Sequence, residues 1–199
     1  DGLVLTEADL EAGPDGIAGE RPVIFDNYAR LGPDGSGRNP VTWQMLRQCG
    51  ITYRGSSLEP ARLWHDPDRL DSWTRENLLR YWRPWLTQTE PLAARPDLDS
   101  LIAEATEWGV LGVTRLHYTL ATSAITSKHG AGLYALETFS SAWHPIIEEA
   151  LRIRERRDQP SRYGNPIERA HQVRDYIAMV INDALTLPVC DAAADKPQR

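Results

Sequence analysis

The sequence predicts a mainly α-helical protein with a short strand-forming region at its start. Residues 1–38 contain short β-like runs broken by glycine and proline, whereas apolar residues beyond residue 39 recur at helical spacing. The chain has 199 residues, of which 41% are hydrophobic and 25% are charged. This balance is typical of a folded globular protein of one or two domains.

The strand-forming region is predicted from two runs and the turn between them. Residues 1–6 and 21–26 have β-like composition, and residues 13–16, Gly-Pro-Asp-Gly, have the composition of a turn. Two strands cannot form a stable sheet alone. We therefore expect residues 1–38 to be the end of a sheet that needs further strands.

Helices are predicted over most of residues 39–187, which we interpret as a helical bundle domain followed by a polar tail at 188–199. Asn39 is a typical N-cap, Pro40 suits the first helical position, and Gly50 suits the end of that helix. Pro84 should kink the second helix. The helices are expected at 40–49, 67–89, 97–122, 127–138, 142–156 and 166–185.

Charge and composition exclude several classes of protein. The formal net charge is -6, which argues against an extended nucleic-acid surface. No apolar run reaches the roughly 18 residues of a membrane span, and no leader-like segment is present, so we expect a cytoplasmic location. The two cysteines are far apart, and no zinc-like spacing or phosphate loop occurs.

Arg115 lies on a face of the 97–122 helix that should be largely covered, because apolar stripes run along more than one face of this helix. A covered guanidinium needs an anion. Arg115 is therefore expected to pair either with Glu104, Glu107 or another carboxylate, or with an anionic ligand.

Lys128 is predicted in the first turn of the next helix, with Thr126 or Ser127 as the cap. A cation there opposes the helix dipole, at a cost of about 0.3–1 kcal/mol. Free backbone N–H groups together with an ammonium group nevertheless favour a phosphate. Lys128 is thus either a solvated surface lysine or, with Arg115, part of a site for one polyphosphate. The basic residues of 152–157 are expected to form a solvated helix end.

These segments resemble a known family. Residues 113–128, VTRLHYTLATSAITSK, together with residues 143–150, WHPIIEEA, are similar to the C-terminal helical domain of aminoglycoside nucleotidyltransferases of the streptomycin/spectinomycin adenylyltransferase kind. The likeness covers roughly residues 39–156. In that family a nucleotidyltransferase domain precedes a helical bundle, and ATP and the drug bind between them. Residues 1–38 would then be the incomplete end of a mixed α/β nucleotidyltransferase sheet.

The resemblance implies nucleotide-binding and catalytic roles for four residues. Arg115 and Lys128 fall on positions that contact the ATP phosphates, which agrees with the charge argument above. Arg154 falls on a position near the nucleotide base, where its planar guanidinium could stack. Asp1 falls on the position of a carboxylate that acts as general base. A frayed or exposed carboxylate is the alternative for Asp1.

The resemblance also implies three residues that contact the drug. An aromatic drug contact best matches Trp82, with Trp85 as a shifted alternative. An acidic drug contact falls at Ala105, so the flanking Glu104 and Glu107 are the candidates for holding a cationic substrate. For these residues and for Arg154, an ordinary packed or solvated helix residue is the alternative interpretation.

Taken with the resemblance, the chain is expected to be the C-terminal part of an enzyme that transfers AMP from ATP, with Mg²⁺, to a hydroxyl of an aminoglycoside, an aminocyclitol or a similar sugar. Antibiotic resistance is the associated role. We identify no counterpart of the family's phosphate-binding Gly-Ser loop and metal-holding Asp-x-Asp pair in these 199 residues, so no metal ligand is expected here. The alternatives are a non-catalytic nucleotide- or drug-binding helical module and a helical protein-interaction domain.

Overall fold

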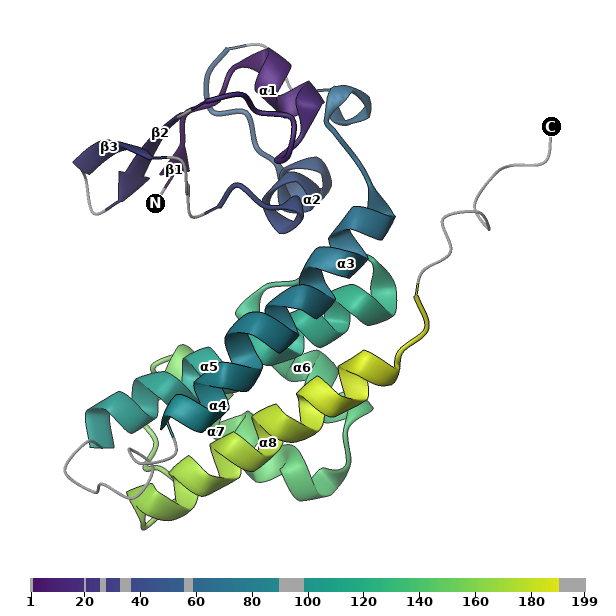
Figure 1. Ribbon diagram of the computed structural model, residues 1–199. Coiled ribbons are helices and arrows are strands. Elements are labelled where there is room, and N and C mark those ends of the chain that lie inside the picture. Colours follow the sequence, from purple (N-terminus) through teal and green to yellow (C-terminus); the bar gives the residue numbers. More distant parts are fainter. Residues whose placement is uncertain are drawn as a thin grey trace. The chain divides into compact units, whose positions relative to one another are not determined.

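The computed structural model describes residues 2–19, 21–25, 28–32, 37–55, 59–89 and 99–189. They form two compact units, the first ending at Trp73 and the second beginning at Thr74 (Figure 1). The first unit holds β1 (Gly2–Leu3), α1 (Glu7–Ala12), β2 (Arg21–Phe25), β3 (Tyr28–Gly32), α2 (Pro40–Cys49) and a 3₁₀ turn (Pro60–Arg62). α3 (Pro67–Asn77) contributes residues to both units.

The sheet of the first unit is antiparallel, with strand order β1-β2-β3. Gly2 lies opposite Ile24, and Phe25 lies opposite Tyr28. The sequence pattern predicts a strand over residues 1–6, but of the described residues only Gly2–Leu3 are in that strand, and α1 follows almost at once. A capping box starts α1: the Thr6 hydroxyl accepts the Asp9 N–H, and the Asp9 carboxylate accepts the Thr6 N–H.

α2 has the predicted bounds and the predicted cap. The Asn39 side chain accepts the N–H of Thr42, and Gly50 follows the last turn. Trp43 is 1% exposed, and its indole N–H donates to the Leu10 carbonyl at 3.0 Å. This buried aromatic ring places α2 in the first compact unit, whereas the sequence pattern predicts that the bundle domain begins at residue 39.

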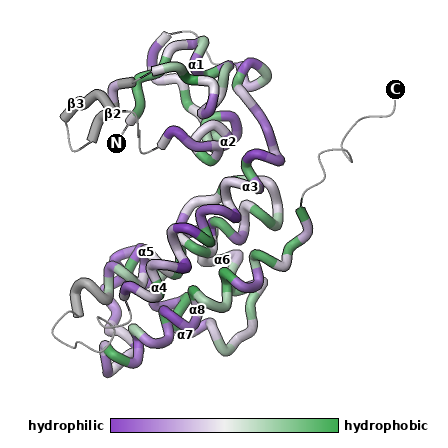
Figure 2. Tube along the Cα trace, in the orientation of Figure 1, coloured by the Kyte–Doolittle hydropathy of each residue, from purple (hydrophilic) through white to green (hydrophobic). Residues whose placement is uncertain are grey.

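The second unit is a helical bundle, which confirms the mainly α-helical prediction. Its central helix is α5 (Asp99–Thr122), which packs against α6 (Lys128–Thr138), α7 (His144–Arg154) and α8 (Pro166–Thr186). α8 alternates between hydrophobic and hydrophilic residues along its length (Figure 2). A Cβ at Gly109 would lie 2.8 Å from Ile177 Cδ1, so this glycine permits the close approach of α5 and α8.

The second predicted helix is interrupted where the sequence predicts a kink. A π-helical turn (Leu78–Trp82) separates α3 from α4 (Arg83–Thr89). Its last bond runs from the Arg83 N–H to the Leu78 carbonyl. Pro84 has no N–H to donate and its ring crowds the preceding turn, so it favours a widened turn just before it.

A 3₁₀ turn (Ser141–Trp143) leads directly into α7. Within the described part of the chain, no helix combines the length and the apolar character that crossing a membrane requires.

Candidate functional site

Two basic side chains from different helices meet one carboxylate of α5. Lys128, the first residue of α6, places Nζ 3.0 Å from Glu107 Oε1. Arg154, the last residue of α7, places Nη1 3.4 Å from the same oxygen. The Glu107 and Lys128 side chains are 21% and 26% exposed, and that of Arg154 is 51% exposed. These three residues, called the Glu107 cluster below, carry one formal positive charge in excess and stay accessible to solvent.

Arg115 lies about two helical turns after Glu107 on α5 and has a different partner. Its Nε donates to the Thr126 carbonyl at 3.0 Å. Burial lowers the pKa of its guanidinium. The expected pairing of Arg115 with Glu104 or Glu107 is not among the ion pairs of the described residues, and Glu107 pairs with Lys128 and Arg154 instead. Arg115 is therefore a half-buried cation held next to the start of α6 by a backbone carbonyl.

The chain reverses sharply after α5, and this brings Lys128 to the middle of that helix. Ser123 adopts a left-handed conformation with φ of 56°, which ends α5 and turns the backbone. Although Lys128 follows the end of α5 by six residues, it contacts Glu107, about four helical turns before that end. Residues 123–127 thus run back along α5.

The start of α6 is capped as predicted. Ser127 Oγ accepts the N–H of Gly130 at 2.9 Å. The next residue after Lys128, His129, places Nδ1 2.8 Å from Glu155 Oε1, and Glu155 also pairs with Arg157. Arg152, Arg154 and Arg157 at the end of α7 pair with carboxylates, while the side chains of Arg154 and Arg157 are each 51% exposed, as expected for a solvated helix end.

An aromatic cluster lies between the π-helical turn and α5. The Trp82 and Trp108 rings are 4.4 Å apart between centroids, and Trp85 and Tyr81 contact Trp108 at 5.5 and 5.9 Å. Trp82 is only 5% exposed, whereas Tyr81 is 50% exposed. A Cβ at Gly112 would lie 2.9 Å from Trp82 Cζ2, so the glycine makes room for this ring. Trp82 thus lies in the hydrophobic core and orients the more exposed rings.

The other predicted site residues lie apart from these contacts. Glu104 is exposed on α5, one turn before Trp108. Asp1 lies outside the described residues. Within the part of the chain that the structure describes, no group of three or more histidine, cysteine, aspartate or glutamate side chains is arranged to hold a metal ion. The described residues therefore do not fit a Mg²⁺ site.

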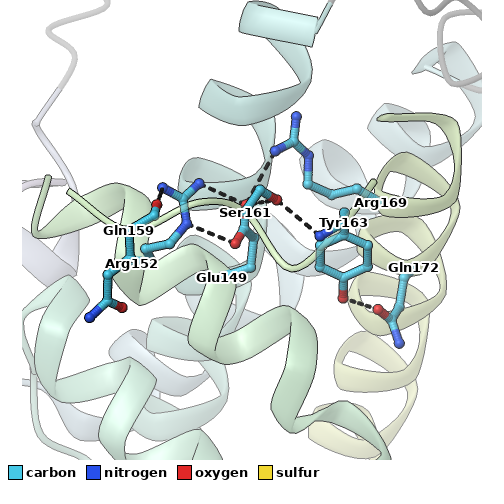
Figure 3. A network of polar contacts seen from close by, with 7 residues as sticks. All are labelled: Glu149, Arg152, Gln159, Ser161, Tyr163, Arg169 and Gln172. Atoms are coloured by element: carbon cyan, nitrogen blue, oxygen red, sulfur yellow. Dashed lines mark hydrogen bonds and ion pairs between the residues drawn. The ribbon is translucent and has the colours of Figure 1, made fainter. Parts of the chain in front are cut away.

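A second carboxylate cluster, called the Glu149 cluster, lies between α7 and α8 (Figure 3). Glu149 is 1% exposed and accepts two hydrogen bonds from Arg152, at 2.9 and 2.8 Å, one from Ser161 at 2.7 Å and one from Arg169 at 3.2 Å. Burial by itself would raise the pKa of Glu149, but these donors outweigh it and hold the pKa at about 2. The cluster fixes the end of α7, where Arg154 is placed.

Sequence reasoning missed both this cluster and a polar chain through His117. His117 Nε2 lies 2.7 Å from Asp183 Oδ2, and its Nδ1 lies 2.9 Å from the Tyr134 hydroxyl. The signal available in the sequence is a histidine within the most apolar helix, but its partners lie on α6 and α8 and carry no shared local pattern.

Comparison with known families accounts for most of the bundle. Residues 92–180 match the model of the aminoglycoside adenylyltransferase C-terminal domain. The resemblance drawn from residues 113–128 and 143–150 is thereby confirmed. The match covers less than half of the chain. The adenylyltransferase C-terminal domain match contains Glu104, Glu107, Arg115, Lys128 and Arg154, whereas Trp82 and Asp1 lie outside it. It extends into α8 and begins after α4.

No curated protein and no solved structure matches the chain.

Proposed function

We propose that the chain is the C-terminal part of a nucleotidyltransferase that transfers AMP from ATP to a hydroxyl of an aminoglycoside, an aminocyclitol or a similar sugar. The observation that carries the proposal is the Glu107 cluster within the adenylyltransferase C-terminal domain match. Three helices contribute to it, and its two cations face one partly exposed carboxylate. Such cations can exchange a carboxylate for a phosphate oxygen, because both ligands accept charge-assisted hydrogen bonds.

The nucleotide would be bound by cations of the bundle. Lys128 and Arg154 are exposed enough to meet a ligand, and Arg115 is held beside the start of α6 by the Thr126 carbonyl. A triphosphate gains more from several converging cations than one carboxylate does. Lys128 also begins a helix of 11 residues, so its charge adds to the positive end of the helix dipole.

The cationic substrate would be bound by carboxylates and aromatic rings. Glu104 is exposed and Glu107 is partly exposed, so both can pair with amino groups of a drug. A sugar ring would meet Tyr81, Trp85 or Trp108, which Trp82 supports from beneath. Asp1 stays a prediction for the general base. Because the described residues do not fit a metal site, we assign no step to Mg²⁺ on this chain.

The proposal is tested by isothermal titration calorimetry of the chain with Mg-ATP. We expect binding that weakens about tenfold or more in Arg115→Ala and in Lys128→Ala, because each loses a charge-assisted contact to phosphate. Arg80→Ala is the matched control, since the Arg80 side chain is 81% exposed and pairs with Glu76 on its own helical segment. Binding that is absent, or that Arg80→Ala weakens equally, would contradict a phosphate site on the bundle.

A protection experiment gives a second readout. The sequence contains two lysines, Lys128 and Lys196. We expect Mg-ATP to slow the acylation of Lys128 by an amine reagent relative to Lys196, measured by mass spectrometry. Equal rates with and without Mg-ATP would argue against contact between Lys128 and the nucleotide.

A further inference from the structure

A hydrogen-bond chain centred on a buried histidine joins three helices of the bundle and ends at Asp183, whose side chain is 51% exposed. His117 of α5 is 2% exposed and lies between Tyr134 of α6 and Asp183 of α8. The His117 and Phe139 rings are 5.0 Å apart, and the Tyr118 ring packs edge-to-face on Tyr134 at 5.1 Å. Aromatic rings thus pack against both the imidazole and the Tyr134 ring.

The direction of each hydrogen bond follows from the chemistry of the partners. An ionised carboxylate only accepts, so His117 Nε2 carries the proton that is donated to Asp183. When the ring is neutral, Nδ1 accepts and the Tyr134 hydroxyl donates to it; Thr138 is a second hydrogen-bond partner of this tyrosine. Burial raises the pKa of Tyr134, so its hydroxyl remains a donor in neutral solution.

The contact lies further along α6 than the contacts made by the cations. Lys128 meets Glu107 at the start of α6, and the Thr126 carbonyl meets Arg115 just before it. Tyr134 meets His117 two residues beyond Arg115 on α5. Lys128 and Tyr134 thus anchor α6 at two separate places on α5, and Arg115 holds the segment just before α6, so together these contacts fix where α6 lies along α5.

We propose that His117 is a positioning residue for the nucleotide site, because its bond to Tyr134 holds α6 in the register that places Lys128 beside Glu107. This inference rests on the function proposed above. His117 touches no substrate. His117 keeps the Lys128 ammonium at the position where it binds Glu107. A phosphate group would replace Glu107 at this same position.

The first test compares two tyrosine variants in the full chain. Tyr134→Phe should speed the acylation of Lys128 relative to Lys196, and should weaken Mg-ATP binding, each by about threefold to tenfold, as expected for one lost hydrogen bond. Tyr176→Phe is the matched control. It removes a buried hydroxyl that bonds to Thr114 of α5 at 2.7 Å and leaves the α6 tether intact. We expect it to lower the melting temperature without changing either readout.

The second test uses two replacements of the same imidazole. In His117→Asn the side-chain oxygen can take the place of Nδ1 and accept from Tyr134, whereas in His117→Gln the longer amide takes the place of Nε2 and faces Asp183. We expect the asparagine variant to retain the wild-type acylation ratio and affinity, and the glutamine variant to behave like Tyr134→Phe.

The outcomes separate the two proposals. An acylation ratio that Tyr134→Phe leaves unchanged, or that Tyr176→Phe changes equally, overturns the positioning role even when the wild-type chain binds Mg-ATP. Absence of Mg-ATP binding by the wild-type chain overturns the proposed function, and the nucleotide role of His117 with it.

Discussion

The Glu107 cluster and the Glu149 cluster have the same charges but opposite surroundings. Each sets one glutamate against two basic side chains. Glu149 is 1% exposed and accepts four hydrogen bonds, whereas the Glu107 side chain is 21% exposed and its two contacts converge on one oxygen. A buried carboxylate whose oxygens are already fully hydrogen-bonded cannot exchange its partners with a ligand. A partly exposed carboxylate can release its partners to a ligand. The comparison teaches that burial, rather than charge, separates the structural cluster from the candidate binding cluster.

The largest expected effect is on the stability that the buried Glu149 cluster contributes. Glu149→Ala should lower the free energy of unfolding by about 3–5 kcal/mol, because it removes the carboxylate that two buried or half-buried arginines share. Urea unfolding at neutral pH measures it. Glu148→Ala is the control, since Glu148 pairs with the 65% exposed side chain of Arg162. Equal losses in the two variants would mean that burial does not separate the clusters.

Acid should weaken the Glu149 cluster in a defined range of pH. The pKa of Glu149 in the fold is about 2, below its ordinary value of 4.5. Its carboxylate therefore stabilises the fold fully above pH 4.5, and that contribution is lost as the pH falls toward 2. Unfolding measured across this range should show a loss of stability that is smaller in Glu149→Ala. A variant with the wild-type pH dependence would contradict the assignment.

The smallest effect on stability is expected at the exposed cluster. Glu107→Gln should change the free energy of unfolding by less than about 1 kcal/mol, as for other exposed ion pairs. It should nevertheless raise the acylation rate of Lys128 relative to Lys196, because the ammonium loses its anionic partner. Glu104→Gln, which alters an exposed carboxylate on the same helix, should leave the ratio unchanged. A large loss of stability in Glu107→Gln would make this cluster structural as well.

Local sequence signals predicted most of the described helices closely. α2 begins after the Asn39 cap and ends before Gly50, and α6 begins after Ser127, because a cap satisfies backbone groups within three residues of itself. α1 was missed although it has a capping box, since its six residues carry too little apolar periodicity to indicate a helix.

The sequence indicated the residues of the candidate site but did not predict which of them form pairs. Arg115 and Lys128 stood out as cations in places that favour an anion, yet their partners are a backbone carbonyl and Glu107. The reversal at Ser123 decides this, because it returns α6 to the middle of α5. Nothing in the residue types near Lys128 indicates a carboxylate that lies 21 residues away.

By itself, the sequence determined the helical class of the bundle, most of its helix bounds and the likeness to the adenylyltransferase C-terminal domain. These depend on periodicity, caps and short motifs, whose physical effects act over one or two turns. The tertiary structure alone decided which cations meet Glu107, that Trp82 is buried, and that Glu149 is saturated by donors from α7 and α8. Ion pairing and burial depend on how distant helices pack, and that packing is set by the whole core rather than by any local segment.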